Sequence, residues 1–174
     1  MKNQQKNKMA VTLFIVAAVL LIISIFKRKA ITWAVQNTGK DVATKAANLI
    51  KQFEGFAPKS FWDYKQYTWG YGTKTTALGL TITKEQAEIE LVKELAPLIK
   101  QLQATGVKLT DNQSIAFISF GYNLGASIML NLVGRLKNGE PMESVKTSFL
   151  KYINAGGKPL KGLIERRKRE ASYL

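Results

Sequence analysis

Two carboxylic acids, nine positions apart, form the part of this sequence that is best suited to chemistry. Glu54 stands between Phe53 and Phe56, and Asp63 follows in a segment rich in aromatic residues. Apolar surroundings disfavour the ionised form of a carboxyl group, so we expect Glu54 to keep a proton that it can donate. Asp63 is expected to lie in wetter surroundings and to ionise. Two carboxyl groups in such unlike environments are typical of sites that break glycosidic bonds.

A hydroxyl group and a glycine-rich segment follow the second acid. Thr68 comes after four intervening residues and precedes Trp69–Gly72, and its hydroxyl is suited to holding a water molecule. Each feature also has an ordinary structural explanation, because Asp often begins a turn and Thr favours strands. The aromatic residues of this segment suit either stacking on sugar rings or packing within a sheet. The residue types alone therefore leave both interpretations open.

The composition excludes several classes of site. The chain has 174 residues and contains neither Cys nor His. Disulfides, Cys-based metal sites, His-ligated zinc and Ser-His or Cys-His catalysis are therefore excluded. Acid–base chemistry must come from Asp, Glu, Lys or Tyr, and we expect no metal and no cofactor.

The acids must be positioned by a helix and a small sheet. Asp41 is expected to cap a helix that ends at Gly55, and the alternation of aromatic residues and Thr with Gly over Phe61–Ile82 predicts a twisted antiparallel sheet. The helix has apolar residues near 3.6-residue spacing. These are Val42, Ala46, Leu49, Ile50 and Phe53.

Two capping boxes predict the helices that follow. Thr83 with Gln86 begins a helix that should reach about residue 103, and Thr110 with Gln113 begins an apolar helix. Shorter helices are expected near 127–137, 141–152 and 160–172. The predicted fold class is therefore α+β, mainly helical with a small antiparallel sheet, preceded by one transmembrane helix.

That transmembrane helix is predicted at Met9–Phe26, an apolar run of 18 residues with three basic residues on each side. At about 1.5 Å per residue it reaches roughly 27 Å, close to the thickness of the bilayer core. Lys27–Lys29 follow directly, with no small-residue cleavage site of a signal peptide. We expect an anchor at 1–29, a linker at 30–40 and a catalytic domain at 41–174. The equal flanking charges do not decide the orientation.

The chain is strongly basic. Its formal net charge is +14, of which the six basic residues before position 30 supply six and the rest of the chain +8. Such a charge favours a polyanionic partner, which can be a nucleic acid, an anionic lipid or an acidic cell-wall polymer. A membrane-tethered nucleic-acid binder is one interpretation, although the sequence has no recognised nucleic-acid motif.

Three ordered motifs resemble the phage-type lysozymes of the T-even and lambdoid endolysin kind. Leu49–Gly55 is similar to the family's first motif, Asp63 follows the Glu after eight residues as the family's acid does, and Thr68–Gly72 is similar to its Thr-Ile-Gly-Tyr-Gly segment. The resemblance covers about residues 46–174. Its downstream part consists of Leu109–Gln113, Ser119–Gly125, Tyr152–Leu163, Arg166, Arg167 and Glu170.

This resemblance implies a lysozyme fold and cleavage of peptidoglycan between N-acetylmuramic acid and N-acetylglucosamine. The separation of the two carboxyl groups decides between inversion and retention at the sugar carbon, and the resemblance favours inversion. It implies Glu54 as general acid, Asp63 as second carboxylate and Thr68 as the hydroxyl that holds the water. The residues that would line the sugar site are Tyr71, Gly72 and Asn123. The expected protein is a membrane-anchored phage lysis or host-penetration enzyme with a monomeric catalytic domain that faces the cell wall and binds no nucleic acid.

Two departures from the family pattern give an alternative. Four residues separate Asp63 from Thr68 where the family usually has five, and Thr73 stands where the family usually has His. A shorter hairpin shifts the geometry of the acids. The alternative is therefore a catalytically impaired, lysozyme-like protein that binds glycan or has a structural role in a membrane-containing virion.

Overall fold

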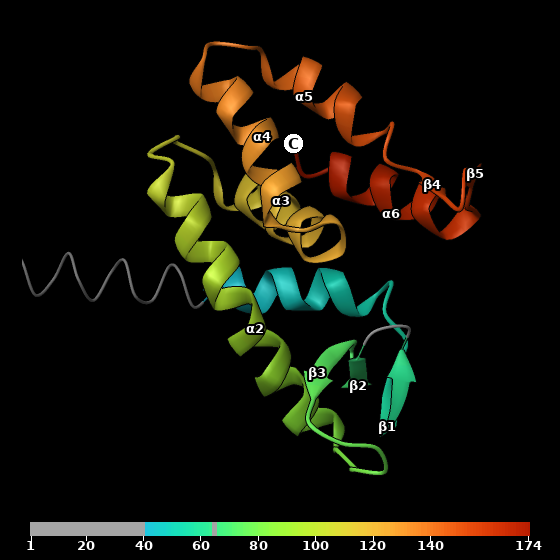
Figure 1. Cartoon of the computed structure of the whole chain (residues 1–174). Helices are drawn as coiled ribbons and strands as arrows, with labels where there is room; N and C mark the ends of the chain where they lie inside the picture. Colours follow the sequence, from blue (N-terminus) through green and yellow to red (C-terminus); the bar gives the residue numbers. More distant parts are fainter. Residues whose placement is uncertain (1–40, 64–65) are drawn as a thin grey trace, which may run out of the picture. The chain divides into compact units, whose positions relative to one another are not determined.

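The computed structural model describes residues 41–63 and 66–174 (Figure 1). The predicted anchor at Met9–Phe26 and the predicted linker at 30–40 lie outside the described residues. Within the two described ranges, no helix has the length and apolar character that crossing a bilayer requires.

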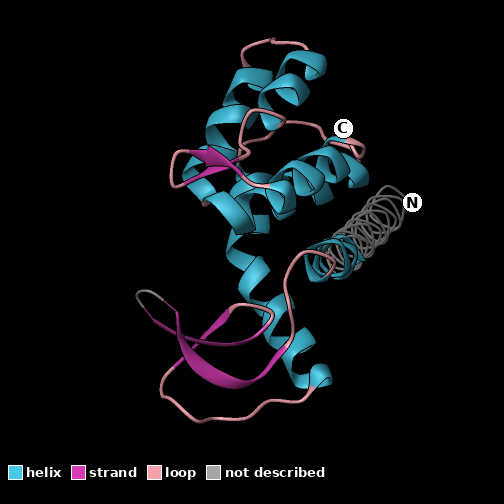
Figure 2. Cartoon of the chain, turned by 90° about the vertical axis from the view of Figure 1, so that its right-hand side faces the viewer, coloured by secondary structure: helices cyan, strands magenta, loops and turns pink. Residues whose placement is uncertain are grey.

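A small sheet and a group of helices make up the described part. Figure 2 shows the sheet beside one end of the long helix α2, with the other helices gathered towards its opposite end. This arrangement confirms the predicted α+β class. The elements after a helix at 41–51 are β1 (Ala57–Asp63), β2 (Gln66–Gly70), β3 (Thr73–Thr75), α2 (Lys84–Ala104), α3 (Asp111–Leu124), α4 (Ala126–Lys137), α5 (Met142–Phe149), β4 (Asn154–Ala155), β5 (Lys158–Pro159) and α6 (Lys161–Ala171).

The helix at 41–51 differs from its prediction in two ways. Asp41 is itself helical rather than a cap, and its carboxylate lies 2.7 Å from the Lys45 ammonium on the next turn. The regular helix stops at residue 51, and a final turn follows in which the N–H groups of Phe53 and Glu54 both donate to the Ile50 carbonyl. Glu54 therefore closes this final turn, in a bend beyond the regular helix.

The three strands β1, β2 and β3 form an antiparallel sheet in chain order, with Phe61 opposite Thr68. The sheet begins at Ala57, four residues earlier than predicted. Ser60 accounts for the early start, because its buried hydroxyl donates to the Ala77 carbonyl (2.8 Å) and accepts from the Leu80 N–H (2.9 Å). The loop after β3 is thereby tied along β1.

Both predicted capping boxes are confirmed, and they fix where α2 and α3 begin. The Thr83 hydroxyl accepts from the Gln86 N–H at 3.2 Å, and the Gln86 side chain accepts from the Thr83 N–H at 3.0 Å. Thr110 and Gln113 repeat the same pair of hydrogen bonds at the start of α3. These bonds satisfy N–H groups that the first helical turn leaves without partners.

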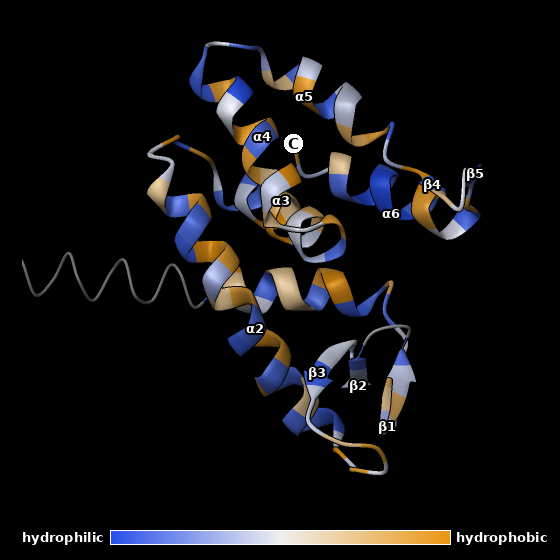
Figure 3. Ribbon diagram, in the orientation of Figure 1, coloured by the Kyte–Doolittle hydropathy of each residue, from blue (hydrophilic) through white to orange (hydrophobic). Residues whose placement is uncertain are grey.

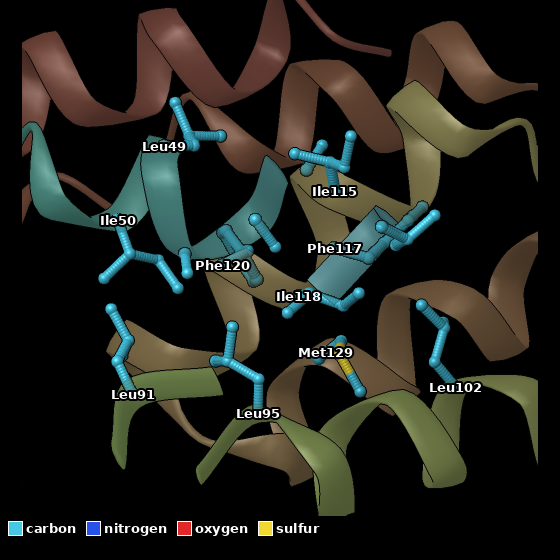
Figure 4. Close-up of a cluster of buried hydrophobic side chains, with 14 of the residues drawn as sticks. Leu49, Ile50, Leu91, Leu95, Leu102, Ile115, Phe117, Ile118, Phe120 and Met129 are labelled. Carbon is cyan, nitrogen blue, oxygen red and sulfur yellow. The ribbon is translucent and has the colours of Figure 1, made fainter. Parts of the chain in front are cut away.

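Apolar side chains from α2, α3 and the helix at 41–51 meet in one core (Figure 4). α3 is buried along most of its length, and Phe120 stacks on Phe149 of α5 with ring centroids 4.0 Å apart. Figure 3 shows that α6 is, by contrast, largely hydrophilic. Four of its residues are nevertheless buried: Arg166, Arg167, Glu170 and Ala171.

Gly70 at the end of β2 permits close contact between the sheet and α2. Its φ is +59°, and a Cβ at this position would lie 2.8 Å from the Ala87 Cβ. We expect Gly70→Ala to lower the free energy of unfolding by about 2–5 kcal/mol, through backbone strain and overpacking together. Gly106→Ala is the control, because its φ is +72° with open space around it. Urea denaturation of both variants separates the two costs, and equal losses would contradict the packing explanation.

Candidate active site

The Glu54 carboxylate is held by an arginine that lies 112 residues further along the chain. Its Oε1 accepts a hydrogen bond of 2.7 Å from Arg166 Nη1. The Arg166 side chain is 4% exposed and that of Glu54 is 27% exposed. The Phe53 ring lies beneath the same guanidinium, with its centroid 5.4 Å away. The surroundings of Glu54 thus combine an aromatic side chain with a buried cation, whereas the sequence predicted apolar neighbours alone.

The second oxygen of Glu54 faces the turn between β2 and β3. A Cβ at Gly72 would lie 3.9 Å from Glu54 Oε2 and 3.4 Å from Tyr122 Oη, and Gly72 has a φ of +89°. Glycine therefore supplies both the backbone conformation and the space in front of this oxygen. The structure thus places Glu54 beside Gly72.

Tyr122 of α3 fixes that turn from the other side. Its hydroxyl donates to the Tyr71 carbonyl at 2.9 Å. Burial raises the pKa of Tyr122 strongly, and the carboxylates of Glu94 and Glu54 raise it further. The hydroxyl therefore remains a hydrogen-bond donor throughout the neutral range. Its position also holds the backbone at Gly72 beside Glu54.

Two further predicted site residues, Asn123 and Tyr71, differ in whether their side chains can reach a ligand. Asn123 is half-buried, and its Oδ1 accepts from Arg167 Nη2 at 2.6 Å, which leaves its amide N–H groups to meet a ligand. Tyr71 as a whole is 7% exposed and its ring packs on Phe56 at a centroid distance of 5.5 Å, so the ring belongs to the core. The carbonyl of Tyr71 accepts from Tyr122, and this contact fixes the turn at Gly72.

Asp63 and Thr68 lie on the hairpin of β1 and β2. Asp63 is exposed at the end of β1, and its carboxylate forms no hydrogen bond or ion pair with another described residue. Thr68 is 1% exposed, and its hydroxyl has no hydrogen-bond partner among the residues that the structure describes. A buried hydroxyl without a partner is costly and is normally satisfied by a ligand or water. The roles of both residues remain predictions.

Arg166 is the site residue that the sequence reasoning did not assign. In the sequence it stands only as part of the C-terminal motif. A signal was present, because Arg166 and Glu170 are four residues apart in a predicted helix and so share one face. The contact with Glu54, however, joins two distant segments, and no local spacing reveals it.

The comparisons with known proteins identify the family. The phage lysozyme family model matches residues 51–170. The chain belongs to the phage lysozyme family. The endolysin of Bacillus phage PZA is 33% identical over 141 residues, and the endolysin of Lactococcus phage c2 is 31% identical over the same length. The alignments cover 76% of this chain but 54% and 59% of those endolysins, so the chain spans little more than half of their length.

Solved structures of related proteins support the lysozyme-like fold. The muramidase domain of SpmX from Asticaccaulis excentricus aligns with a TM-score of 0.67 and 26% identity, over 74% of this chain and 92% of that domain. An endolysin from Escherichia coli O157:H7 phage FAHEc1 aligns with a TM-score of 0.63 and 29% identity, over 74% of this chain and 89% of that one. The fold of this family member is therefore lysozyme-like, mainly helical with a small antiparallel sheet.

Glu94 of α2 is a further acid near the site and gives a prediction on pH. Its Oε2 is buried without a hydrogen-bond partner among the described residues, and burial raises its pKa above 4.5 although Lys74 acts in the opposite direction. A carboxyl with a raised folded-state pKa contributes stability at acid pH, and this contribution is lost as the pH rises through that pKa. Glu94→Gln should therefore become more stable relative to the parent as the pH rises from 4 to 8.

Thermal unfolding at several pH values measures this difference. Glu90→Gln on the same helix is the control, because Glu90 belongs to an exposed pair with Lys93 (2.8 Å) and such pairs contribute only about 0–1 kcal/mol. A difference between the Glu94 variant and the parent that stays constant with pH would contradict the prediction.

Proposed function

We propose that this chain is a muramidase that hydrolyses the bond between N-acetylmuramic acid and N-acetylglucosamine in peptidoglycan. The observation that carries this proposal is the Glu54 carboxyl group, with Oε1 on Arg166 and Oε2 towards Gly72. One oxygen is anchored, so the other has a defined direction in which to present a proton. Membership of the phage lysozyme family supports the same reaction.

In the proposed reaction Glu54 Oε2 gives its proton to the glycosidic oxygen as the bond to the sugar carbon breaks. A water molecule adds to that carbon from the opposite face. Asp63, which is exposed, stabilises the positive charge and takes the proton that the water loses. The Thr68 hydroxyl orients this water, and its lack of a partner among the described residues is consistent with that role.

Glycan binding is assigned to the groups around this oxygen. The amide of Asn123 and the backbone at Tyr71 and Gly72 are the proposed contacts. Asn123 is well prepared for this role because Arg167 holds its carbonyl oxygen, which fixes the direction of its N–H groups. The net charge of +14 favours attraction to an anionic cell wall.

The test of this function uses purified peptidoglycan and the full chain. We expect new reducing ends that borohydride reduction converts to muramitol, as hydrolysis after the muramic acid residue requires. Glucosaminitol would indicate the other glycosidic bond. Binding to the glycan without new reducing ends would support the alternative of a catalytically impaired, glycan-binding protein.

We also infer that Met9–Phe26 anchors the chain in a membrane, with the domain at 41–174 directed to the cell wall. The support is the length of the apolar run and the three basic residues on each side. The full chain should float with lipid vesicles through a density gradient. Val16→Arg with Val19→Arg should stay in the dense fraction, because each central charge opposes insertion by about 2.5–3.5 kcal/mol, and should keep its activity. Flotation of this variant would contradict the anchor.

A further inference from the structure

Four ionisable side chains form one connected group behind the candidate site. Both oxygens of Glu170 face α3 or the arginines of its own helix. Oε1 accepts from the Ser119 hydroxyl (2.7 Å) and from Arg166 Nε (3.1 Å), while Oε2 lies 3.0 Å from Arg167 Nη1 as an ion pair without the alignment of a hydrogen bond. Arg166 continues to Glu54, and Arg167 continues to Asn123.

The spacing along α6 produces this arrangement. Arg166 and Arg167 precede Glu170 by four and three residues, so both guanidinium groups reach the same carboxylate. Two other charged residues of this stretch, Glu165 and Lys168, are 59% and 64% exposed. One side of α6 therefore carries the buried group and another side carries ordinary surface charges.

Stability alone does not explain such a group. Glu170 and Arg167 are fully buried, and burial raises the pKa of Glu170 and lowers that of Arg167 to about 10. Buried ion pairs contribute little net stability, since desolvation offsets their attraction. They do fix geometry, because each charge must keep its partner.

The balance of charge links this group to the proposed reaction. Two guanidinium groups face two carboxylates while Glu54 is ionised. When Glu54 holds the proton that it must donate, Glu170 is the remaining carboxylate of the group. Glu170 then keeps Arg166 in position whichever protonation state Glu54 has. Arg166 is therefore already in place to bind the Glu54 carboxylate after each proton transfer.

We propose that Glu170 is a positioning residue that holds Arg166 against Glu54 and Arg167 against Asn123, and so couples the proton donor to the glycan-binding amide. This inference rests on the proposed function. Glu170 itself touches neither the substrate nor the reacting atoms. It acts through the two arginines, one on each side.

The test is a pair of substitutions, Glu170→Gln and Asn123→Ala, made singly and together, with Glu165→Gln as the control on the same helix. Glu170→Gln should lower kcat and raise KM for peptidoglycan, whereas Glu165→Gln should change neither. Asn123→Ala should raise KM by about 2- to 10-fold in the parent, as expected for one lost hydrogen bond. In the Glu170→Gln background the same change should raise KM less than twofold, because the amide is no longer oriented. Effects that simply multiply in the double variant would overturn the coupling.

A second measurement does not need turnover, and so separates this inference from the proposed function. The Nε–H groups of Arg166 and Arg167 should exchange slowly with water in the NMR spectrum of the parent. Glu170→Met has no oxygen that can accept from the Arg166 Nε–H, so it should speed the exchange at Arg166, while Glu165→Met leaves it unchanged. An unaltered rate at Arg166 overturns the positioning role even in a chain that proves inactive. If Glu170→Gln does not fold, the double variant Arg167→Met with Glu170→Met replaces it, because this variant removes one cation and one anion together. Unchanged kcat and KM in the double variant would also overturn the proposal.

Discussion

Replacing Glu54 with glutamine is expected to reduce peptidoglycan hydrolysis by about 100- to 10,000-fold, the usual contribution of a general acid. Glutamine has nearly the same shape and can still accept from Arg166, so the site remains assembled. It cannot donate a proton to the glycosidic oxygen. The loss should therefore appear in kcat, while binding of intact peptidoglycan persists.

The matched control for this prediction is Glu165→Gln. Glu165 lies on α6 near Arg166 and is 59% exposed beside Lys168. The same chemical change there should leave both activity and stability as they are. Circular dichroism of both variants checks that they are folded. If the Glu54 variant clears peptidoglycan at the parent rate, Glu54 is not the acid.

Replacing Arg166 with methionine has the largest expected effect on stability. Its side chain is 4% exposed and joins two carboxylates, of which Glu170 is fully buried. Methionine fills much of the same volume but leaves Glu170 with fewer partners and Glu54 with none from α6. Breaking one partner out of a buried ionic group costs about 3–5 kcal/mol, so we expect a loss of that size in the free energy of unfolding.

Denaturation in urea measures this loss, with Lys168→Met as the control. Lys168 is a cation on the same helix that is 64% exposed and 3.7 Å from Glu165. An exposed pair of this kind contributes about 0–1 kcal/mol. Equal losses in the free energy of unfolding of the two variants would show that Arg166 contributes no more to stability than an exposed cation. Activity of the Arg166 variant should fall as well, because Glu54 loses its fixed orientation.

The sequence predicted the helices well because their signals are local. Thr83 and Thr110 each begin a helix with a hydroxyl and a glutamine three residues later, and both boxes form as expected. The sheet was placed in the correct region but begins earlier, at Ala57. Its early start depends on the Ser60 hydroxyl and a loop some twenty residues away, which no local pattern contains.

The catalytic and binding roles of the site residues stay predictions, and the structure adds the contacts that these residues make. Glu54 lies beside Gly72. Arg167 binds the Oδ1 of Asn123, which leaves the amide N–H groups of Asn123 without a bond to Arg167. Tyr71 was expected to line the sugar site, yet its ring is in the core. An aromatic residue in a short sheet can line a sugar site or pack in the core. For Tyr71 the contact with the Phe56 ring decides for the core, and this contact cannot be read from the local sequence. The contact between Arg166 and Glu54 depends on tertiary structure alone.

The distance along the chain between Glu54 and Arg166 has a consequence for biosynthesis. A ribosome makes Glu54 and the whole β-hairpin before it makes α6. Until α6 has been made and has folded back, the nascent polypeptide carries the acid without the guanidinium that orients it. Under the proposed function, Glu54 is therefore oriented only late in translation, and we expect an interrupted product that lacks α6 to be inactive.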